Sequence, residues 1–274
     1  MLTRIISGAV GVVILAAVLF FHNTLVLPIA VALIIVLMIY ELMKATGCSK
    51  FLPMLIAALA YGASVPLILG TSLEKYGICI KIAAVFAVFV TFIAKHKGIR
   101  YEQTAFTLAA MILVPEAMTT LIRIDKFSSE HGLFLLVLGL CGAWIADTGA
   151  YFVGTFLGKH KLCPEISPKK TVEGFAGGII ITGILFAAIA ALYKNVITDS
   201  PIEINYIMFA VTGMVCAVIG TVGDLSASMI KRQCGVKDYG KIMPGHGGMM
   251  DRFDSVLFVL PTFYAFVSLA GIAK

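Results

Sequence analysis

The sequence predicts an all-α protein, a polytopic transmembrane helical bundle of about nine spans, from its composition, its apolar runs and the positions of its charges. Of the 274 residues, 60% are hydrophobic and 13% are charged, and the mean hydropathy is +1.00. A soluble domain of this length would carry about 25% charged residues. No linker or low-complexity segment interrupts the chain, so we expect one transmembrane domain over residues 1–274.

Nine apolar runs have roughly the 20 residues that a membrane-spanning helix requires. The runs cover residues 5–21, 24–43, 52–70, 76–94, 104–122, 133–157, 172–193, 205–230 and 252–272. The small residues that mark a signal-peptidase site do not follow the first run. We therefore expect an uncleaved first span.

The basic residues predict how the spans are oriented. With the N-terminus in the cytoplasm, the cytoplasmic loops contain 14 Lys and Arg residues and the opposite side contains five. Cytoplasmic loops of membrane proteins are enriched in basic residues. We therefore predict a cytoplasmic N-terminus, with the two long polar loops, residues 158–171 and 231–250, on the side that contains nucleotides.

The net charge of +6 does not by itself indicate a nucleic-acid partner. The basic residues lie in short loops between apolar runs, where membrane orientation explains them, so we expect no nucleic acid. The six cysteines include no CxxC pair and no cysteine–histidine cluster at zinc spacing. We therefore expect neither disulfides nor zinc.

Residues 221–254 concentrate aspartate, lysine and arginine in a chain that is otherwise mostly apolar. If the first part of this stretch is helical, one face carries the residues at i, i+4, i+7 and i+8, which are Asp224, Ser228, Lys231 and Arg232. Asp251, Asp254 and Ser255 then open the next apolar run. Between these groups lies a glycine-rich loop that contains Pro244, which cannot continue a helix.

The residue types in this stretch suit a metal-bound polyphosphate. Carboxylate oxygens are the ligands that Mg²⁺ prefers, whereas Lys, Arg and exposed backbone N–H groups bind phosphate oxygens. The simpler alternative is that Asp224 and Asp251 only form ion pairs with Lys231 and Arg252 in an ordinary connecting loop. We favour a functional site, because carboxylates in or beside membrane spans are costly and usually serve function.

A second polar cluster lies around the start of the seventh apolar run. Ser167, Lys169, Lys170 and Thr171 precede this run, and hydroxyl and ammonium groups before a helix N-terminus bind anions. The simpler alternative is a basic membrane anchor with Thr171 as a helix cap. Because residues 221–254 are predicted on the same side of the membrane, we expect the two clusters to share a phosphate site.

The sixth apolar run carries an acid and a ridge of small residues. Asp147 falls within the run, where a carboxylate needs a cation or a hydrogen-bond donor nearby. Alanine or glycine at positions 146, 150, 154 and 158 forms a smooth ridge, on which another helix can pack closely.

Residues 1–130 are predicted to form scaffold spans, and residues 133–274 to carry the active site. Glu41 and Glu116 are the acids within the scaffold runs. We expect Glu41 to form an interfacial ion pair with Lys44, whereas Glu116 has no evident partner. No internal repeat is visible, which argues against a transporter built from inverted halves.

The string SMIKRQCGVKDYGKIMPGHGGMMDRFDS resembles the signature of the integral-membrane phosphatidate cytidylyltransferases, also called CDP-diglyceride synthases. The positions that carry the resemblance are Ser228, Lys231, Arg232, Lys237, Asp238, His246, Gly247, Gly248, Asp251, Arg252 and Asp254. The upstream strings DTGAYFVG and SPKKTVEGFAGG also resemble this family, so the likeness covers about residues 145–255.

The resemblance implies that CTP and phosphatidate form CDP-diacylglycerol and pyrophosphate for phospholipid biosynthesis, with Mg²⁺ required. It further implies a metal centre on Asp224 and Asp251, which can include a monovalent ion such as K⁺. If one ion joins the two carboxylates, they lie within about 6 Å of each other. The family also suggests a homodimer in the bacterial inner membrane, with the active site facing the cytoplasm.

Most of the charged residues and several hydroxyl-bearing and glycine residues of the two clusters have an expected role. We expect Asp224, Asp251, Lys231 and Arg232 to be catalytic. The residues expected to bind substrate are Asp147, Ser167, Lys169, Lys170, Thr171, Ser228, Lys237, His246, Gly247, Gly248 and Arg252. Asp238 and Asp254 are expected to orient the basic residues. His246 lies between glycines, so we expect it to shape the loop or to donate to a phosphate, with proton transfer as the alternative.

Two other functions are compatible with these residues. A CTP-dependent kinase or cytidylyltransferase acting on another membrane lipid, of the dolichol or ether-lipid type, would need a similar site. An anion transporter would also carry basic loops. The transporter is disfavoured because the polar residues cluster on one predicted face of the membrane instead of following a path across it.

Overall fold

The computed structural model describes residues 2–199, 202–245 and 247–269, and most of these residues are helical. The α-helices are α1 (Leu2–Phe20), α2 (Val26–Ala45), α3 (Leu52–Ile68), α4 (Gly77–Ala94), α5 (Tyr101–Asp125), α6 (Gly132–Leu157), α7 (Val172–Leu192), α8 (Tyr206–Gln233), α9 (Met250–Phe253) and α10 (Val256–Leu269). Three short helical turns are η1 (Cys48–Lys50), η2 (Glu74–Tyr76) and η3 (Tyr193–Ile197). Strands β1 (Lys161–Cys163) and β2 (Ser167–Thr171) form an antiparallel hairpin.

The all-α membrane fold predicted from the sequence is confirmed. Each predicted apolar run coincides with a helix, and the last run coincides with α9 and α10 up to residue 269. Residues 270–272 of that run lie outside the described residues. Among the described residues, seven helical segments are long and apolar enough to cross a membrane, and Ile6–Phe20 and Leu52–Ile68 are shorter apolar helices. The count of nine spans and the cytoplasmic N-terminus therefore stay predictions.

The chain divides into two compact units, and the predicted single domain is not tested by this division. The first unit comprises residues Met1–Ile122 and Gln233–Phe253, and the second comprises Arg123–Arg232 and Asp254–Lys274. The signature loop, a name used here for the described residues 234–245 and 247–249, therefore belongs to the same unit as the N-terminal helices.

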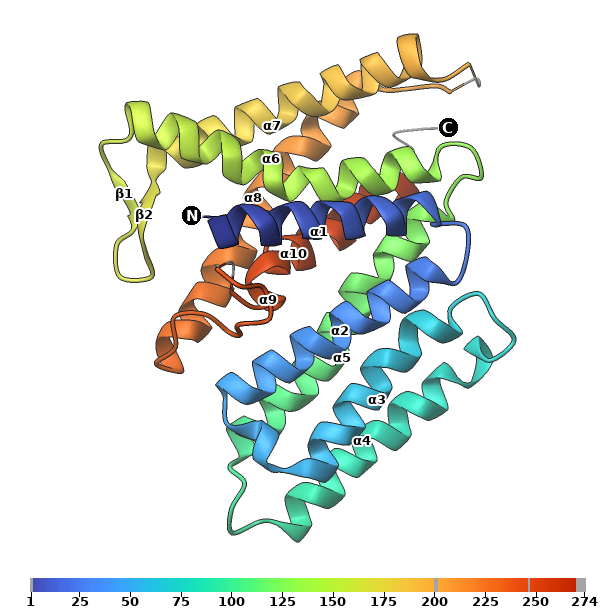
Figure 1. Cartoon of the computed structure of the whole chain (residues 1–274), viewed down its shortest axis with the longest axis vertical. Coiled ribbons are helices and arrows are strands. Elements are labelled where there is room, and N and C mark those ends of the chain that lie inside the picture. Colours follow the sequence, from blue (N-terminus) through green and yellow to red (C-terminus); the bar gives the residue numbers. More distant parts are fainter. Residues whose placement is uncertain (1, 200–201, 246, 270–274) are drawn as a thin grey trace. The chain divides into compact units, whose positions relative to one another are not determined.

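In the first unit, α2 packs against α3, and α3 packs against α4. Figure 1 shows these three helices side by side. Ile35, Met38 and Ile39 of α2 are fully buried, as is Met54 of α3. Other large apolar side chains are exposed, such as Phe86, which is 69% exposed. Outward-facing apolar side chains are expected where lipid is the solvent.

In the second unit, α6 and α7 form the most extensive helix pair. A Cβ atom on Gly174 would lie 2.6 Å from the Ala150 carbonyl oxygen, and one on Gly178 would lie 2.9 Å from the Ala146 carbonyl oxygen. The backbones of the two helices therefore approach so closely that only glycine fits at these positions. The predicted ridge of small residues on the sixth run is confirmed as a packing surface.

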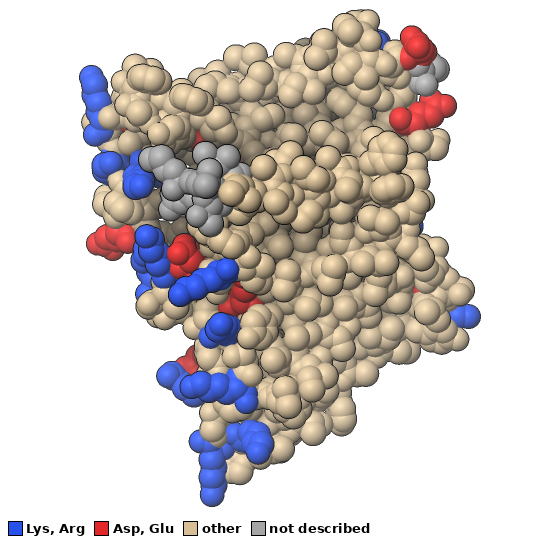
Figure 2. All heavy atoms as spheres, in the orientation of Figure 1, with Lys and Arg blue, Asp and Glu red and all other residues tan. Residues whose placement is uncertain are grey.

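Basic residues gather at one end of each unit. In the second unit, Figure 2 shows Lys and Arg atoms at the β1–β2 hairpin and acidic atoms over the connection between α7 and α8. In the first unit, Lys and Arg atoms gather where the α2–α3 and α4–α5 connections lie. The sequence predicted that basic residues would be concentrated on one side of the membrane, and a basic end on each unit is consistent with that prediction.

Candidate active site

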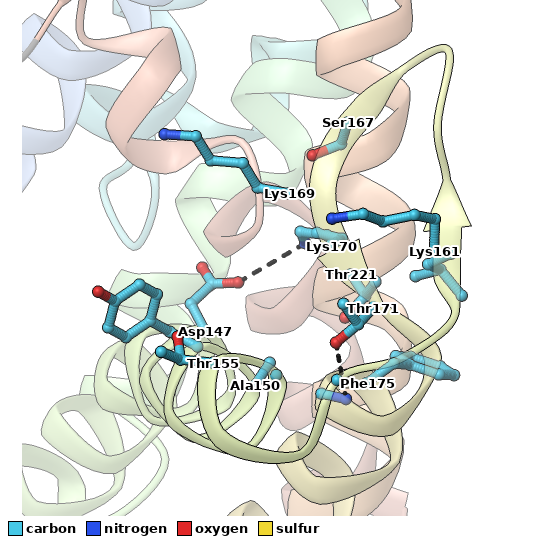
Figure 3. Close-up of a pocket in the computed structure, with 15 residues that line it drawn as sticks. Asp147, Ala150, Thr155, Lys161, Ser167, Lys169, Lys170, Thr171, Phe175 and Thr221 are labelled. Atoms are coloured by element: carbon cyan, nitrogen blue, oxygen red, sulfur yellow. Dashed lines mark hydrogen bonds and ion pairs between the residues drawn. The ribbon is translucent and has the colours of Figure 1, made fainter.

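A pocket of about 490 Å³ lies in the second unit, between α6, the β1–β2 hairpin, the start of α7 and one residue of α8. Its lining residues are Asp147, Ala150, Tyr151, Gly154, Thr155, Gly158, Lys161, Leu162, Ser167, Lys169, Lys170, Thr171, Gly174, Phe175 and Thr221. Figure 3 shows the α6 residues on one wall and the hairpin residues on the other. The structure therefore brings together five residues predicted to bind substrate, which are Asp147, Ser167, Lys169, Lys170 and Thr171.

Lys170 joins two carboxylates at this pocket. Its Nζ lies 2.7 Å from Oδ2 of Asp224 and 3.8 Å from Oδ1 of Asp147. The Lys170 side chain is 22% exposed and that of Asp224 is 23% exposed, so solvent screens the pair only in part. Figure 3 shows Lys170 extending from β2 towards Asp147 on α6. The sequence predicted a cation or a hydrogen-bond donor beside Asp147, and Lys170 is such a cation.

A third carboxylate, that of Asp254, belongs to the same cluster. Asp254 is 8% exposed, and its Oδ1 accepts a hydrogen bond of 2.7 Å from the backbone N–H of Ser255. It lies within electrostatic reach of Asp224, Asp147 and Lys231. Asp147, Asp224 and Asp254 thus interact electrostatically with one another or with Lys170 and Lys231. The role predicted for Asp254, that of orienting basic side chains, stays a prediction.

Two further acceptors hold the hairpin against the start of α7. Thr171 is the N-cap of α7, and its Oγ1 accepts a hydrogen bond of 3.1 Å from the backbone N–H of Gly174. The Glu173 carboxylate accepts hydrogen bonds from the backbone N–H groups of Lys159 and His160 and lies 2.6 Å from Nδ1 of His160. The capping role proposed for Thr171 is therefore confirmed, and its contact with substrate stays a prediction.

Replacing Thr171 with valine should lower the free energy of unfolding by about 1 kcal/mol, because the cap hydrogen bond is lost while the side-chain shape is kept. Thr171→Ser retains the hydroxyl and is the matched control. Thermal unfolding of the purified protein in detergent measures the difference. Equal stability of the valine and serine variants would show that the cap contributes nothing.

The other predicted residues of the second unit lie along α8. Asp224, Ser228 and Lys231 are partly exposed, and Arg232 is exposed. All four belong to the helix Tyr206–Gln233, as the spacing predicted. Their direct contact with substrate stays a prediction.

In the first unit, the signature loop orients Asp251. Oδ2 of Asp251 accepts hydrogen bonds of 2.9 Å from the backbone N–H groups of Tyr239 and Gly248. Gly247 has a φ of +88°, and a Cβ atom at this position would lie 3.0 Å from the same oxygen. Glycine at 247 is thus required both by the left-handed backbone and by the nearby carboxylate.

The structure says less about the remaining signature residues. Lys237, Asp238 and Arg252 are exposed, and His246 lies outside the described residues. Among the described residues, no three His, Cys, Asp or Glu side chains form a group that could hold a metal ion. Asp224 and Asp251 belong to different units, so their pairing over one ion stays a prediction.

The prediction for Glu41 was wrong. Its carboxylate is 1% exposed, and instead of pairing with Lys44 it accepts hydrogen bonds from the backbone N–H groups of Met249 and Met250. Sequence reasoning missed this contact, although an acid within an apolar run was the available signal. Glu116, for which the sequence offered no partner, lies 2.7 Å from Nζ of Lys81.

Comparison with known proteins identifies the family of the chain. The model of the cytidylyltransferase family matches residues 2–270. Phosphatidate cytidylyltransferase of Bacillus subtilis (strain 168) is 42% identical over 169 residues, which are 62% of this chain and 60% of that protein. The proteins of the same name from Staphylococcus saprophyticus and Staphylococcus aureus (strain COL) are 45% and 46% identical over 132 residues, 48% of each chain. The aligned segments thus span about half to 60% of these relatives, whereas the family model spans almost the whole sequence. The chain belongs to the cytidylyltransferase family.

Proposed function

We propose that this protein is a CTP:phosphatidate cytidylyltransferase that forms CDP-diacylglycerol and pyrophosphate for phospholipid biosynthesis. The observation that carries the proposal is the Lys170 ammonium between Asp224 and Asp147, at a pocket that Lys161, Lys169 and Ser167 also line. Carboxylates beside ammonium and hydroxyl groups suit a substrate that carries both phosphate and a divalent cation. Family membership and the names of the relatives support the same reaction.

The reaction requires the joining of two anions. A phosphate oxygen of phosphatidate attacks the α-phosphorus of CTP, a new P–O bond forms, and the bond from the α-phosphorus to the bridging oxygen of pyrophosphate breaks. The nucleophile is already ionised near neutral pH, so no general base is needed. The barrier is therefore lowered mainly by positioning the reactants and by neutralising charge.

The lysines and arginines supply the positive charge in this proposal. Lys169 and Lys170 bind phosphate oxygens from the hairpin wall, and Lys231 and Arg232 bind them from α8. Lys237 and Arg252 are assigned the same task from the signature loop and from α9. A lysine that already contacts two carboxylates, as Lys170 does, is held in place before substrate binds.

The acids fit a hard divalent cation. Asp224 is only partly buried and lies within electrostatic reach of Asp147 and Asp254, and oxygen donors of this kind suit Mg²⁺. We assign the metal to Asp224 and Asp251, with K⁺ as a second ion of the centre. When bound, Mg²⁺ would neutralise phosphate charge and stabilise the departing pyrophosphate. Asp251 contributes a carboxylate already oriented by two backbone N–H groups.

The proposal includes a setting for the enzyme. It is a multi-pass protein of a bacterial inner membrane, and its site faces the cytoplasm, where CTP is present. A homodimer, which the glycine-rich helices and the family resemblance suggest, is part of the proposal. The basic ends of the units support the cytoplasmic orientation, since basic loops are retained on that side.

Purified protein in detergent should convert radiolabelled CTP and phosphatidate into a labelled lipid, and the conversion should stop when a chelator removes divalent cations. Thin-layer chromatography of the lipid fraction measures the product, and restoring Mg²⁺ after chelation is the control. A lipid kinase would instead release CDP and leave the lipid without cytidine, and an ether-lipid cytidylyltransferase would label only the ether lipid. Uptake of an unchanged anion by proteoliposomes, without labelled lipid, would indicate a transporter.

A further inference from the structure

We propose that Glu41 is a positioning residue that holds the signature loop in the conformation needed to present Asp251. The proposal concerns only the first unit, which contains both α2 and the loop. It rests on the proposed function for its effect on catalysis, and on the contacts of Glu41 for its effect on the loop.

Glu41 binds the end of the signature loop through both of its carboxylate oxygens. Oε1 accepts a hydrogen bond of 3.1 Å from the backbone N–H of Met249, and Oε2 accepts one of 2.8 Å from the backbone N–H of Met250. These donors lie at the start of α9, where helix N–H groups have no partner within the helix. A carboxylate supplied by a distant helix therefore satisfies donors that a local cap would otherwise serve.

Two glycines of the signature region leave room for this carboxylate. A Cβ atom built on Gly240 or on Gly248 would overlap the Glu41 carboxylate. The backbone of the loop therefore contacts the Glu41 carboxylate at two positions, Gly240 and Gly248, where no side chain intervenes. Glu41 itself is 1% exposed, so its truncation leaves two buried backbone N–H groups without their protein acceptor.

The contacts of Glu41 and of Asp251 are consecutive along the backbone. The backbone N–H of Gly248 donates a hydrogen bond to Asp251. The N–H groups of the next two residues, Met249 and Met250, donate hydrogen bonds to Glu41. A shift of the loop at Met249 must therefore move the group that orients the Asp251 carboxylate. Through this connection, a side chain of a scaffold helix controls the geometry of a predicted metal ligand.

The test uses Glu41→Ala and Glu41→Gln in the full-length protein, with Glu116→Gln as the control. Glu116 is also an acid within the helices of the first unit, but its contact is with Lys81 instead of with the loop. Glutamine keeps one acceptor oxygen and turns an N–H₂ group towards the second backbone donor. The exchange rates of the loop amides in Glu41→Gln should therefore lie between those of the wild type and those of Glu41→Ala. Alanine removes both acceptors.

Amide hydrogen exchange of the purified protein in detergent measures the stability of the loop hydrogen bonds independently of enzymatic activity. We expect the amides of Gly248, Met249 and Met250 to exchange about 10-fold to 100-fold faster in Glu41→Ala, and to be unchanged in Glu116→Gln. Steady-state kinetics should show kcat about 10-fold to 100-fold lower, with a matching rise in the Mg²⁺ concentration that gives half-maximal activity. A purely structural role would reduce the amount of folded enzyme and leave that Mg²⁺ concentration unchanged.

A double-mutant cycle with Gly240→Ala isolates the contact itself. The added methyl group should accelerate loop exchange when Glu41 is present, and should change it less than about 2-fold in the Glu41→Ala background, where the carboxylate is gone. Equal effects of Gly240→Ala in both backgrounds would show that Glu41 and the loop are uncoupled.

The outcomes separate this inference from the proposed function. Unchanged amide exchange in both Glu41 variants would overturn the positioning role, whatever the activity. Altered exchange with a Mg²⁺ requirement that is unchanged in Glu41→Ala but raised in Asp251→Asn would also overturn it, because the loop would then not control Asp251. A Mg²⁺ requirement unchanged in both variants would instead refute the metal assignment of Asp251. If Glu41→Ala does not fold, Glu41→Gln decides by the same measurements. Failure of the wild-type protein to label phosphatidate would refute the proposed function while the exchange data still tested the contact.

Discussion

Replacing Asp224 or Asp251 with asparagine should lower kcat for CDP-diacylglycerol formation by about 10²-fold to 10³-fold, the effect of removing one preorganised charge-stabilising group. Asparagine has the size of aspartate but lacks the charge that a divalent cation requires. At 251 its amide oxygen can still accept the two backbone hydrogen bonds that now reach Oδ2. The asparagine variant therefore tests the charge separately from the conformation of the signature loop.

The matched control for the two asparagine variants is Glu130→Gln, which neutralises an exposed acid in the connection between α5 and α6. Activity of the control should equal that of the wild type, since its charge lies outside the pocket lining. Size-exclusion chromatography in detergent establishes that all three proteins are folded. Full activity in both the Asp224 and the Asp251 variants would refute the assignment of the metal to this pair.

Replacing Lys170 with methionine should raise the KM for CTP by about tenfold to hundredfold, the loss expected for one hydrogen bond to a charged group. The methionine keeps the length of the apolar part of the side chain and removes the ammonium group. The loss also leaves Asp224 and Asp147 without the cation that lies between them. Their mutual repulsion should then lower the thermal stability of the protein as well.

Lys159→Met is the control for Lys170→Met, because Lys159 is an exposed lysine of the same loop that does not line the pocket. Lys170→Arg should recover only part of the activity, since a planar guanidinium cannot occupy the position of a compact ammonium between two carboxylates. Initial rates over a range of CTP concentrations measure both effects. A KM for CTP that is the same in the Lys170 and Lys159 variants would exclude Lys170 from substrate binding.

The helices could be predicted from the sequence because hydropathy is a local property of the chain. The sixth apolar run, predicted over residues 133–157, forms the helix Gly132–Leu157, and the small-residue ridge on it faces α7 as expected. The β1–β2 hairpin was not predicted, since strands reading KLC and SPKKT lack the apolar alternation that marks a half-buried strand. The hairpin nevertheless supplies one wall of the pocket.

The candidate site could be predicted in part. The residue types and spacing identified Asp147 and the Ser167–Thr171 segment as members of one polar site, and the pocket contains them. Lys161 and Thr221 also line it. Lys161 belongs to no recognisable motif, and Thr221 opens the stretch 221–254 but was given no role. Glu41 was assigned to the nearest cation in sequence, because an interaction between residues 209 positions apart leaves no periodic signal.

The sequence alone determined the membrane class, the helical segments and the family resemblance, because each depends on residue types at short or regular spacing. Tertiary structure alone decided which groups meet: Lys170 with Asp224 and Asp147, and Glu41 with the amides of Met249 and Met250. These contacts form because acids removed from water must find a donor or a cation wherever packing provides one. The residue that supplies the donor or the cation can lie anywhere along the chain, so only the folded protein reveals which residue it is.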